Sequence, residues 1–237
     1  MNEKINALII DRTDYKEYDI LIHVLTKEHG VMTWIAKGAN KPKSKYGSLL
    51  QPMYLVDALI DAKQGISLFK SASILNMHPS ITEHIERLTV ASFMIKILAI
   101  NAQDDPRLMS YDDVLAYFQL FKTVDRYAIG THFLMTLAKQ MGLELYLDGC
   151  VICNDPKIMG LSITAGGFVC QRCDDQVDHL THSIEFYRQL RCLSKATINQ
   201  ISLCQGAYDT QYMQIYVDLL QDTIKIPHKN WQFLQQI

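Results

Sequence analysis

Four cysteines in the C-terminal half of the chain have the spacing of metal ligands. The segment GCVICNDPKIMGLSITAGGFVCQRC contains Cys150-x2-Cys153, then sixteen residues, then Cys170-x2-Cys173. Two residues between thiolates allow a tight turn to place both sulfurs on one ion, and two such turns complete a tetrahedron with Zn–S distances near ~2.3 Å. We therefore predict one structural Zn²⁺ bound by these four cysteines.

The residues around these ligands fit that interpretation. Asn154 can adopt the left-handed conformation that a turn after a ligand needs, and Gly166-Gly167 permits another tight bend. Four buried thiols without metal are the alternative, and a redox role for the CxxC pairs is a weaker one. Cys192 and Cys204 lie in helical sequence and are interpreted as small buried hydrophobic residues, because structural disulfides are rare in the cytosol.

A second cluster of one residue type is basic. The segment AKGANKPKSKYGSLLQP, residues 36–52, carries Lys37, Lys41, Lys43 and Lys45, and residues 29–56 contain no acid. The whole chain has a formal net charge of −2, so any anion-binding surface must be local. Glycine, asparagine and proline predict a loop, and each lysine that neutralises a phosphate releases a counterion. We predict that these lysines bind nucleic acid; the alternative is an ordinary solvated loop.

Two aromatic residues flank the lysines. Trp34 and Tyr46 are candidates for stacking on bases, and both are included in the predicted nucleic-acid site. For Trp34 a place in the protein core is favoured over base stacking, because it lies on an expected strand with Met32.

Catalytic motifs are absent from the sequence. It contains no GxxxxGK[ST], no GxGxxG after a strand, no HExxH and no GxSxG. A complete set of four thiolates leaves no coordination position for water, so the metal site is expected to be structural. We therefore predict that the protein is not an enzyme; a zinc-dependent enzyme is the weakest alternative.

The elements that must position these residues change in type near residue 79. Short segments rich in β-branched and aromatic residues predict five strands, of which 19–25 is apolar on both faces. The strands expected are 7–10, 19–25, 31–36, 54–60 and 66–75. Strands of this kind fit a small closed barrel of the oligonucleotide-binding (OB) type.

Helical periodicity follows the barrel. Apolar residues recur at helical spacing over 85–98, 114–121 and 129–141, and residues 183–204 and 208–221 also read as helices. The prediction is an α+β protein with a five-stranded OB-fold domain at 1–79 and a helical domain at 80–237. The four-cysteine zinc-finger element, at about 148–175, is inserted into the helical domain.

The sequence also predicts where the protein works. The first residues show neither the long apolar run nor the cleavage site of a signal peptide, so none is expected, and the longest apolar stretch, residues 88–100, is too short to span a bilayer. We expect no membrane association, and a cytoplasmic, nucleoid-associated protein.

The order of these features resembles the RecO family of bacterial recombination mediators. The segment ALIIDRTDYKEYDILIHVLTKEHG is followed by AKGANKPKSKYGSLLQP and by a helical domain broken by CxxC…GGxxCxxC. The resemblance covers most of the chain, and it places the family's basic loop on the four lysines and its metal positions on the four cysteines.

Several properties follow from this resemblance. It implies binding of single- and double-stranded DNA, annealing of complementary strands, and help in loading recombinase onto strands coated by the single-stranded-DNA-binding protein. It implies RecR and the C-terminal tail of that coating protein as partners, without nucleotide hydrolysis. The alternative function is a zinc-stabilised protein–protein adaptor whose DNA contact is incidental, with a groove for a short acidic and hydrophobic tail in its helical domain.

Overall fold

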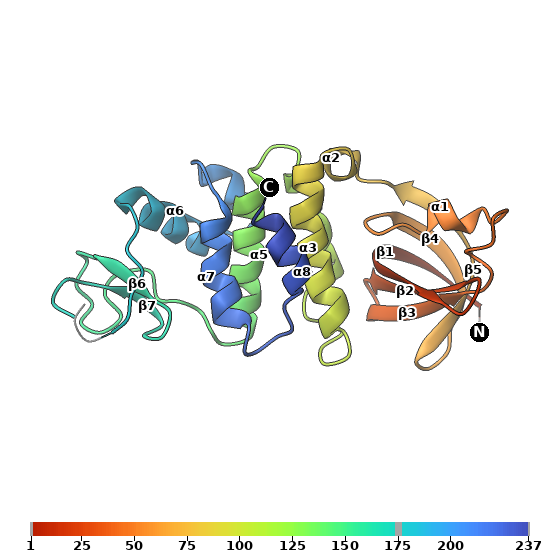
Figure 1. Ribbon diagram of the computed structural model, residues 1–237, viewed down its shortest axis with the longest axis horizontal. Coiled ribbons are helices and arrows are strands. Elements are labelled where there is room, and N and C mark those ends of the chain that lie inside the picture. Colours follow the sequence, from red (N-terminus) through yellow and green to blue (C-terminus); the bar gives the residue numbers. More distant parts are fainter. Residues whose placement is uncertain (1, 174–176, 237) are drawn as a thin grey trace. The chain divides into compact units, whose positions relative to one another are not determined.

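The strand-rich N-terminal sequence folds into a closed five-stranded barrel, as its pattern predicts (Figure 1). The computed structural model describes residues 2–173 and 177–236. The strands are β1 (Asn2–Tyr15), β2 (Asp19–Thr26), β3 (Gly30–Ala36), β4 (Leu55–Asp61) and β5 (Ile66–Asn76). Their order around the barrel is β1-β2-β3-β5-β4; β3 and β5 pair in parallel, and the other neighbours pair antiparallel.

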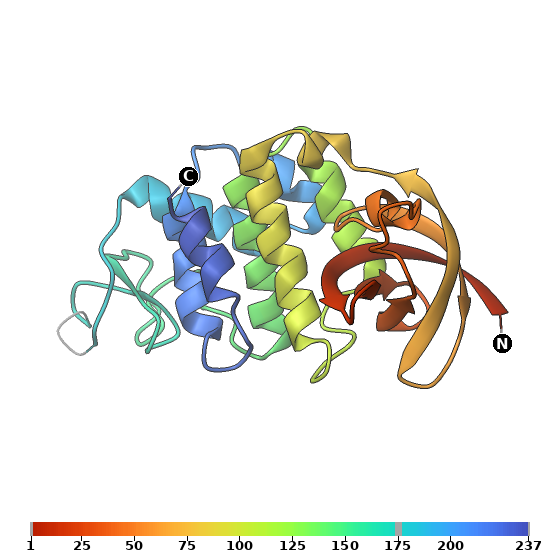
Figure 2. The same cartoon turned by 45° about the vertical axis from the view of Figure 1, so that its right-hand side comes forward.

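Strand β1 is much longer than the four residues expected for it. Its first half pairs with β4 and its second half with β2, and the β2 register shifts between Ile9 and Asp11. An irregularity of this kind bends a strand and increases its twist. β1 can therefore serve two neighbours along its curved path, which Figure 2 shows as the long red ribbon.

The barrel is filled by apolar side chains from all five strands. Ile20, Ile22 and Val24 of β2 are completely buried, which agrees with the apolar pattern of that strand. Each such side chain contributes about 1.5–3 kcal/mol through its removal from water. The segment 37–45, which carries the four lysines, and a short helix, α1 (Tyr46–Leu49), lie between β3 and β4.

By its contacts the chain divides into two compact units. The first contains the barrel with α1 and four further helices, within residues 1–122 and 227–237. These helices are α2 (Pro79–Thr82), α3 (Ile85–Asn101), α4 (Tyr111–Leu120) and α8 (His228–Leu234). Helix α3 contacts β1 through an ion pair of 2.8 Å between Lys96 Nζ and Asp11 Oδ2, and it contacts α8, where the Phe93 and Trp231 rings lie 5.3 Å apart.

The second unit spans residues 123–226. It contains α5 (Arg126–Gln140), the hairpin of β6 (Gly160–Ser162) and β7 (Gly167–Val169), α6 (Ile184–Lys195), the 3-10 helix η2 (Ile198–Leu203) and α7 (Thr210–Leu220). Asp125 begins α5, since its carboxylate accepts hydrogen bonds from the N–H groups of Tyr127 and Ala128. Helix α5 packs against both α7 and α6.

The structure corrects two predictions for this unit. The helix expected over 183–204 is broken, because Ala196 is extended and Thr197 forms a capping box with Gln200 that starts η2. Cys192 and Cys204, interpreted as separate thiols, form a disulfide with Cα atoms 5.6 Å apart. Spacing alone did not reveal the pair, because it depends on the bend at Ala196, which brings Cys204 back to Cys192 of α6.

The predicted boundary at residue 79 stays a prediction. The barrel strands end at Asn76 and the next helix begins at Pro79, whereas the division by contacts falls after Lys122. Residues 174 and 175, at the end of the expected zinc-finger element, lie outside the described residues. Among the described helices, none is both long and apolar enough to cross a membrane.

Candidate nucleic-acid interface and metal centre

The basic loop, defined here as residues 37–45, is anchored to the turn between β1 and β2. The Gly38 N–H donates to Asp19 Oδ1 at 2.8 Å, and the Asn40 N–H donates to the Tyr18 carbonyl oxygen at 3.0 Å. Gly38 has φ +67°, a left-handed conformation that favours glycine. These bonds fix the first half of the loop on the barrel surface.

Polar side chains from β1 hold the same loop from a second direction. Asn40 accepts a hydrogen bond of 2.5 Å from Arg12 and donates one of 2.6 Å to Asp14. Arg12 also donates to the Gly47 carbonyl oxygen at 2.7 Å, and Ala39 between these anchors is buried in the barrel core. A loop held at this many points presents its lysines in defined positions.

The four predicted lysines are all exposed on this loop. Two of them lie near aromatic rings: Lys41 Nζ is 5.9 Å from the centroid of Tyr18, and Lys45 Nζ is 5.3 Å from that of Tyr46. Such cation–π contacts orient a lysine while its ammonium group stays in water. The ammonium groups therefore remain accessible to an anion.

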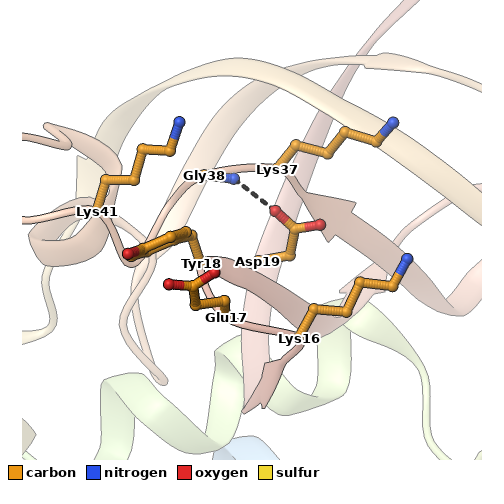
Figure 3. Close-up of a pocket in the computed structure, with 7 residues that line it drawn as sticks. All are labelled: Lys16, Glu17, Tyr18, Asp19, Lys37, Gly38 and Lys41. Atoms are coloured by element: carbon orange, nitrogen blue, oxygen red, sulfur yellow. Dashed lines mark hydrogen bonds between the residues drawn. The ribbon is translucent and has the colours of Figure 1, made fainter.

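Two of these lysines meet a third one at a shallow pocket of about 370 Å³ (Figure 3). Lys37 and Lys41 line it from the loop, and Lys16 lines it from the β1–β2 turn, where its φ is +55°. Glu17 and Asp19 also line the pocket, so it has three cations against two carboxylates. Lys43 and Lys45 do not line it.

Sequence reasoning missed part of this surface. Lys16 and Tyr18 are not among the residues predicted to bind nucleic acid, although the segment Tyr15-Lys16-Glu17-Tyr18 places a cation between aromatic residues. Tyr15 and Tyr18 are 39% and 40% exposed, so a planar ligand can reach both rings. A hydrogen bond with Glu17 raises the pKa of Tyr18 above its ordinary value.

The two aromatic candidates named from sequence are less accessible. Trp34 is fully buried, and its ring stacks on Phe69 with the centroids 6.3 Å apart. Its predicted place in the core is therefore confirmed, and its inclusion among the base-stacking residues is wrong. Its indole nitrogen is buried without a hydrogen-bond partner among the described residues. Tyr46 is half-buried and packs edge-on against Phe69 at 5.2 Å.

The four cysteines come together as their spacing predicts. The Sγ atoms of Cys150, Cys153, Cys170 and Cys173 all lie within 4.8 Å of one another, and the Cys153 and Cys170 sulfurs are 3.5 Å apart. Thiolates on one tetrahedral Zn²⁺ at ~2.3 Å have sulfurs separated by roughly 3.8 Å. The arrangement is therefore one that could hold a metal ion.

Local backbone geometry produces this arrangement. Asn154 has φ +61°, as predicted, and its N–H donates to the Cys150 carbonyl oxygen at 2.7 Å. Gly166 has φ +82°, and a Cβ on Gly167 would lie 2.3 Å from the Tyr146 carbonyl oxygen. Each of these positions lets the chain turn closely around the cluster.

The electrostatics of the cluster favour a bound cation. Burial raises the pKa of Cys150, but backbone hydrogen bonds around Cys153 and Cys170 outweigh it and bring that pKa to about 6. Burial and hydrogen bonds with the neighbouring thiols raise the pKa of Cys173 to about 12. Without a cation the thiols cannot all ionise together at neutral pH, whereas a divalent ion would allow it.

Arg172 is a charged neighbour that sequence reasoning did not single out. Its Nη2 donates to Asp155 Oδ2 at 2.8 Å and lies 3.9 Å from Cys153 Sγ. A cation beside the exposed Cys153 compensates part of the charge of a thiolate cluster. Since four protein thiols would fill a tetrahedral ion, this site suits a structural metal.

Comparisons with known proteins match the whole organisation. Residues 1–78 match the family model described as Recombination protein O N terminal, and residues 82–209 match Recombination protein O C terminal. DNA repair protein RecO of Clostridium perfringens is 29% identical over 200 residues, covering 82% of this chain and 81% of that protein. DNA repair protein RecO of Bacillus cereus strain B4264 is 25% identical over 255 residues, covering 100% and 98%.

Three findings lead to a single conclusion. The barrel carries an anchored basic loop, the second unit carries a cysteine cluster, and both parts of the chain match models of one family. This chain belongs to the RecO family.

Proposed function

We propose that this protein is a non-catalytic, DNA-binding recombination mediator in DNA repair. The observation that carries the proposal is the exposed basic loop, held by hydrogen bonds of Gly38 with Asp19 and of Asn40 with Arg12, and joined by Lys16 at one pocket. Lysines at defined positions on an OB barrel suit a phosphate backbone of either single- or double-stranded DNA. Family membership and the names of the relatives support a role in DNA repair.

The residues proposed to bind DNA are revised from those named by sequence. Lys37, Lys41, Lys43 and Lys45 are retained, and Lys16 is added because it lines the same pocket. Tyr18 and Tyr15 take the place of Trp34 as stacking residues, because both are exposed. Tyr46 is retained as the ring beside Lys45, with only part of its surface open to a base.

Annealing by such a protein requires no nucleotide hydrolysis. Base pairing supplies the free energy, and the protein lowers the repulsion between two phosphate chains by neutralising part of their charge. We propose RecR and the C-terminal tail of the single-stranded-DNA-binding protein as partners for recombinase loading, in the cytoplasm at the nucleoid. One Zn²⁺ on the four cysteines has a structural role in this proposal.

The proposal is tested by fluorescence anisotropy of a labelled single-stranded oligonucleotide across a salt series. In the variant Lys37→Glu/Lys41→Glu, the loss of two phosphate contacts reduces the slope of log affinity against log salt by about 1.4, at about 0.7 per contact. Affinity at low salt falls at least about tenfold. Annealing is followed in a second assay, in which a labelled complementary strand is added and pairing is read by fluorescence energy transfer between the two strands.

A matched control reverses two other exposed lysines of the barrel. Lys63 and Lys70 lie outside the basic loop, so Lys63→Glu/Lys70→Glu has the same change in net charge with a smaller effect on the slope. Equal losses in the two variants would mean that only net charge matters, and would refute the assignment of the loop. Absence of binding by the wild type at low salt would move the function to the adaptor alternative.

A further inference from the structure

The two cysteines outside the four-cysteine cluster differ in their access to water. Cys192 lies in the last turn of α6 and is exposed, whereas Cys204, which follows η2, is only 7% exposed. Their disulfide joins α6 to the end of η2 across a sequence separation of 12 residues. A reagent in water can therefore reach this bond from the side of Cys192.

Contacts that involve no sulfur hold Cys204 in place. Its N–H donates to the Ile201 carbonyl oxygen at 3.0 Å, and its carbonyl oxygen accepts a hydrogen bond from the Tyr208 hydroxyl at 3.0 Å. Ile201 is completely buried and Tyr208 is 7% exposed, so the segment is fixed on both sides of Cys204. These contacts remain available when the disulfide is open.

The bend between the two cysteines has its own anchors. The Ala196 N–H donates to the Cys192 carbonyl oxygen at 3.1 Å, and the Ala196 carbonyl oxygen accepts a hydrogen bond from His132 of α5 at 2.9 Å. Thr197 and Gln200 form the capping box that starts η2. Because the fold itself brings the two cysteines together, their thiols are positioned to react with each other once the bond is open.

The surface around Cys192 is basic. Arg188 precedes Cys192 by four residues on α6 and Lys195 follows it by three, so both lie on its face of the helix. Lys195 donates to Asp148 at 2.5 Å, whereas Arg188 is 3.8 Å from Glu185 and its side chain is 75% exposed, so Arg188 is the more available cation. A nearby cation favours the thiolate form of cysteine, which is the form that attacks disulfides.

We propose that Cys192 and Cys204 form a reversible redox site, which exchanges with low-molecular-weight thiols and disulfides of the glutathione type and sets the stability of the second unit. In the closing direction, the Cys192 thiolate attacks oxidised glutathione and releases one glutathione thiolate, which leaves a mixed disulfide on Cys192. The Cys204 thiolate then attacks the Cys192 sulfur and releases the second glutathione thiolate.

This exchange is balanced. The two protein thiols lose two electrons, the glutathione disulfide gains them, and the two protons pass to the two glutathione thiolates. Opening reverses the steps, and begins when a glutathione thiolate attacks the exposed Cys192 sulfur. Since glutathione has a net negative charge, the cations beside Cys192 also attract it.

A permanent structural disulfide is the alternative. Disulfides of that kind are rare where thiols are abundant, and exposed disulfides belong to the labile class. The anchors of the bend make both the open and the closed form compatible with the fold. The proposal goes beyond DNA binding and does not depend on it, because it concerns a different unit and another chemistry.

The experiment treats the full chain, without denaturant, with an excess of reduced glutathione and then with an excess of oxidised glutathione. Free thiols are blocked with iodoacetamide after each step, and the protein is digested with trypsin for mass spectrometry. Trypsin places Cys192 in the peptide 192–195 and Cys204 in the peptide 196–225. The two peptides should be separate after reduced glutathione and linked again after oxidised glutathione.

Single variants test the order of attack. In oxidised glutathione, Cys204→Ser should retain one glutathione on the peptide 192–195, because no second thiol remains to displace it. Cys192→Ser should take up glutathione on the peptide 196–225 at least about tenfold more slowly, since Cys204 is 7% exposed.

A charge reversal tests the basic surface in the Cys204→Ser background. Arg188→Glu should slow the uptake of glutathione by Cys192 at least about threefold. Lys229→Glu, which reverses an exposed charge in the first unit, is the matched control and should leave the rate unchanged. Equal rates in the two variants would contradict the role of Arg188.

Melting followed by far-UV circular dichroism compares the two states. The closed wild type should melt at least about 3 °C higher than the open wild type, because the bond restricts the unfolded chain. The double variant Cys192→Ser/Cys204→Ser should melt at one temperature in both glutathione buffers, which controls for effects of the buffer on other cysteines.

Three results would overturn the proposal: a bond that stays closed in reduced glutathione, an open pair that does not rejoin in oxidised glutathione, or equal melting temperatures of the two forms. Faster glutathione uptake by Cys204 than by Cys192 would refute the order of attack. No DNA is present in these measurements, so their failure leaves the DNA-binding proposal intact.

Discussion

A buried histidine at the end of the barrel should make the first unit sensitive to acid. His78 lies between β5 and α2, is 4% exposed, and meets the Phe118 ring edge-on at 5.0 Å. Its Nε2 is buried without a hydrogen-bond partner among the described residues. Burial, reinforced by the charge of Lys122, lowers the pKa of His78 from 6.5 to about 4.

The sign and size of the effect follow from this shift. Between pH 6.5 and about 4 the unfolded chain binds a proton at His78 and the folded chain does not. With respect to His78, the free energy of unfolding is therefore highest above pH 6.5, and it decreases as the pH falls from 6.5 toward 4. When the pH is lowered from 7 to 4.5, this one residue reduces the free energy of unfolding by about 2 kcal/mol.

Urea unfolding followed by tryptophan fluorescence measures this loss. Trp34 and Trp231 both lie in the first unit, so their emission reports on the unit that contains His78. The comparison is with His78→Asn, which tolerates the left-handed backbone (φ +50°) and does not titrate. This variant is less stable at pH 7, because it leaves a cavity beside Phe118, but its stability falls about 2 kcal/mol less between pH 7 and 4.5.

Carboxylates that titrate over the same pH range change the stability of both proteins equally, so their effect cancels in the difference between the two proteins. An equal pH dependence in wild type and His78→Asn would refute the reasoning, since it would mean that His78 takes up its proton in the folded state. A histidine signal that titrates near pH 6.5 in the folded protein, observed by NMR and assigned through the variant, would refute it independently.

Three further predictions concern the second unit. Cys173→Ser should lose the metal ion and lower the melting temperature in far-UV circular dichroism, because ion binding is coupled to folding; stoichiometric metal in the purified variant would contradict the ligand set. Gly167→Ala should cost about 1–3 kcal/mol, since its Cβ would meet the Tyr146 carbonyl oxygen at 2.3 Å, and an unchanged denaturation midpoint would count against that close approach. With a chelator and denaturant present, four thiols should react with Ellman's reagent, and reduction should add the two from Cys192 and Cys204; six before reduction would show that this bond does not form.

Much of the fold could be predicted because the sequence is locally consistent. Ile20, Ile22 and Val24 of β2 are buried, as its apolar residues predict, and the cysteine spacing led directly to the cluster. β1 was underestimated because its ends, around Lys4 and Thr13, are polar. They are strands only through pairing with β4 and β2, which propensity does not show.

The candidate sites were predicted less completely, because the residues that form them lie far apart in the sequence. Lys16 joins Lys37 and Lys41 only because Gly38 binds Asp19 across the barrel surface. A groove of the second unit, lined by Leu147 and Phe168 and by Ile184 of α6, has no sequence signal at all, because these residues lie far apart in the chain. Such a surface can be found only once the β6–β7 hairpin and α6 have been placed together.

The return of α8 to the first unit has a consequence for synthesis on the ribosome. The barrel emerges first, but Phe93 of α3 receives its partner Trp231 only when nearly the whole chain has been translated. At about 5–20 residues per second, the 129 residues between Asn101 and Trp231 leave part of α3 uncovered for roughly 6–26 s. The unit that is made first is therefore the last to be completed, and a stop codon before α8 would damage it while sparing the unit that was made after it.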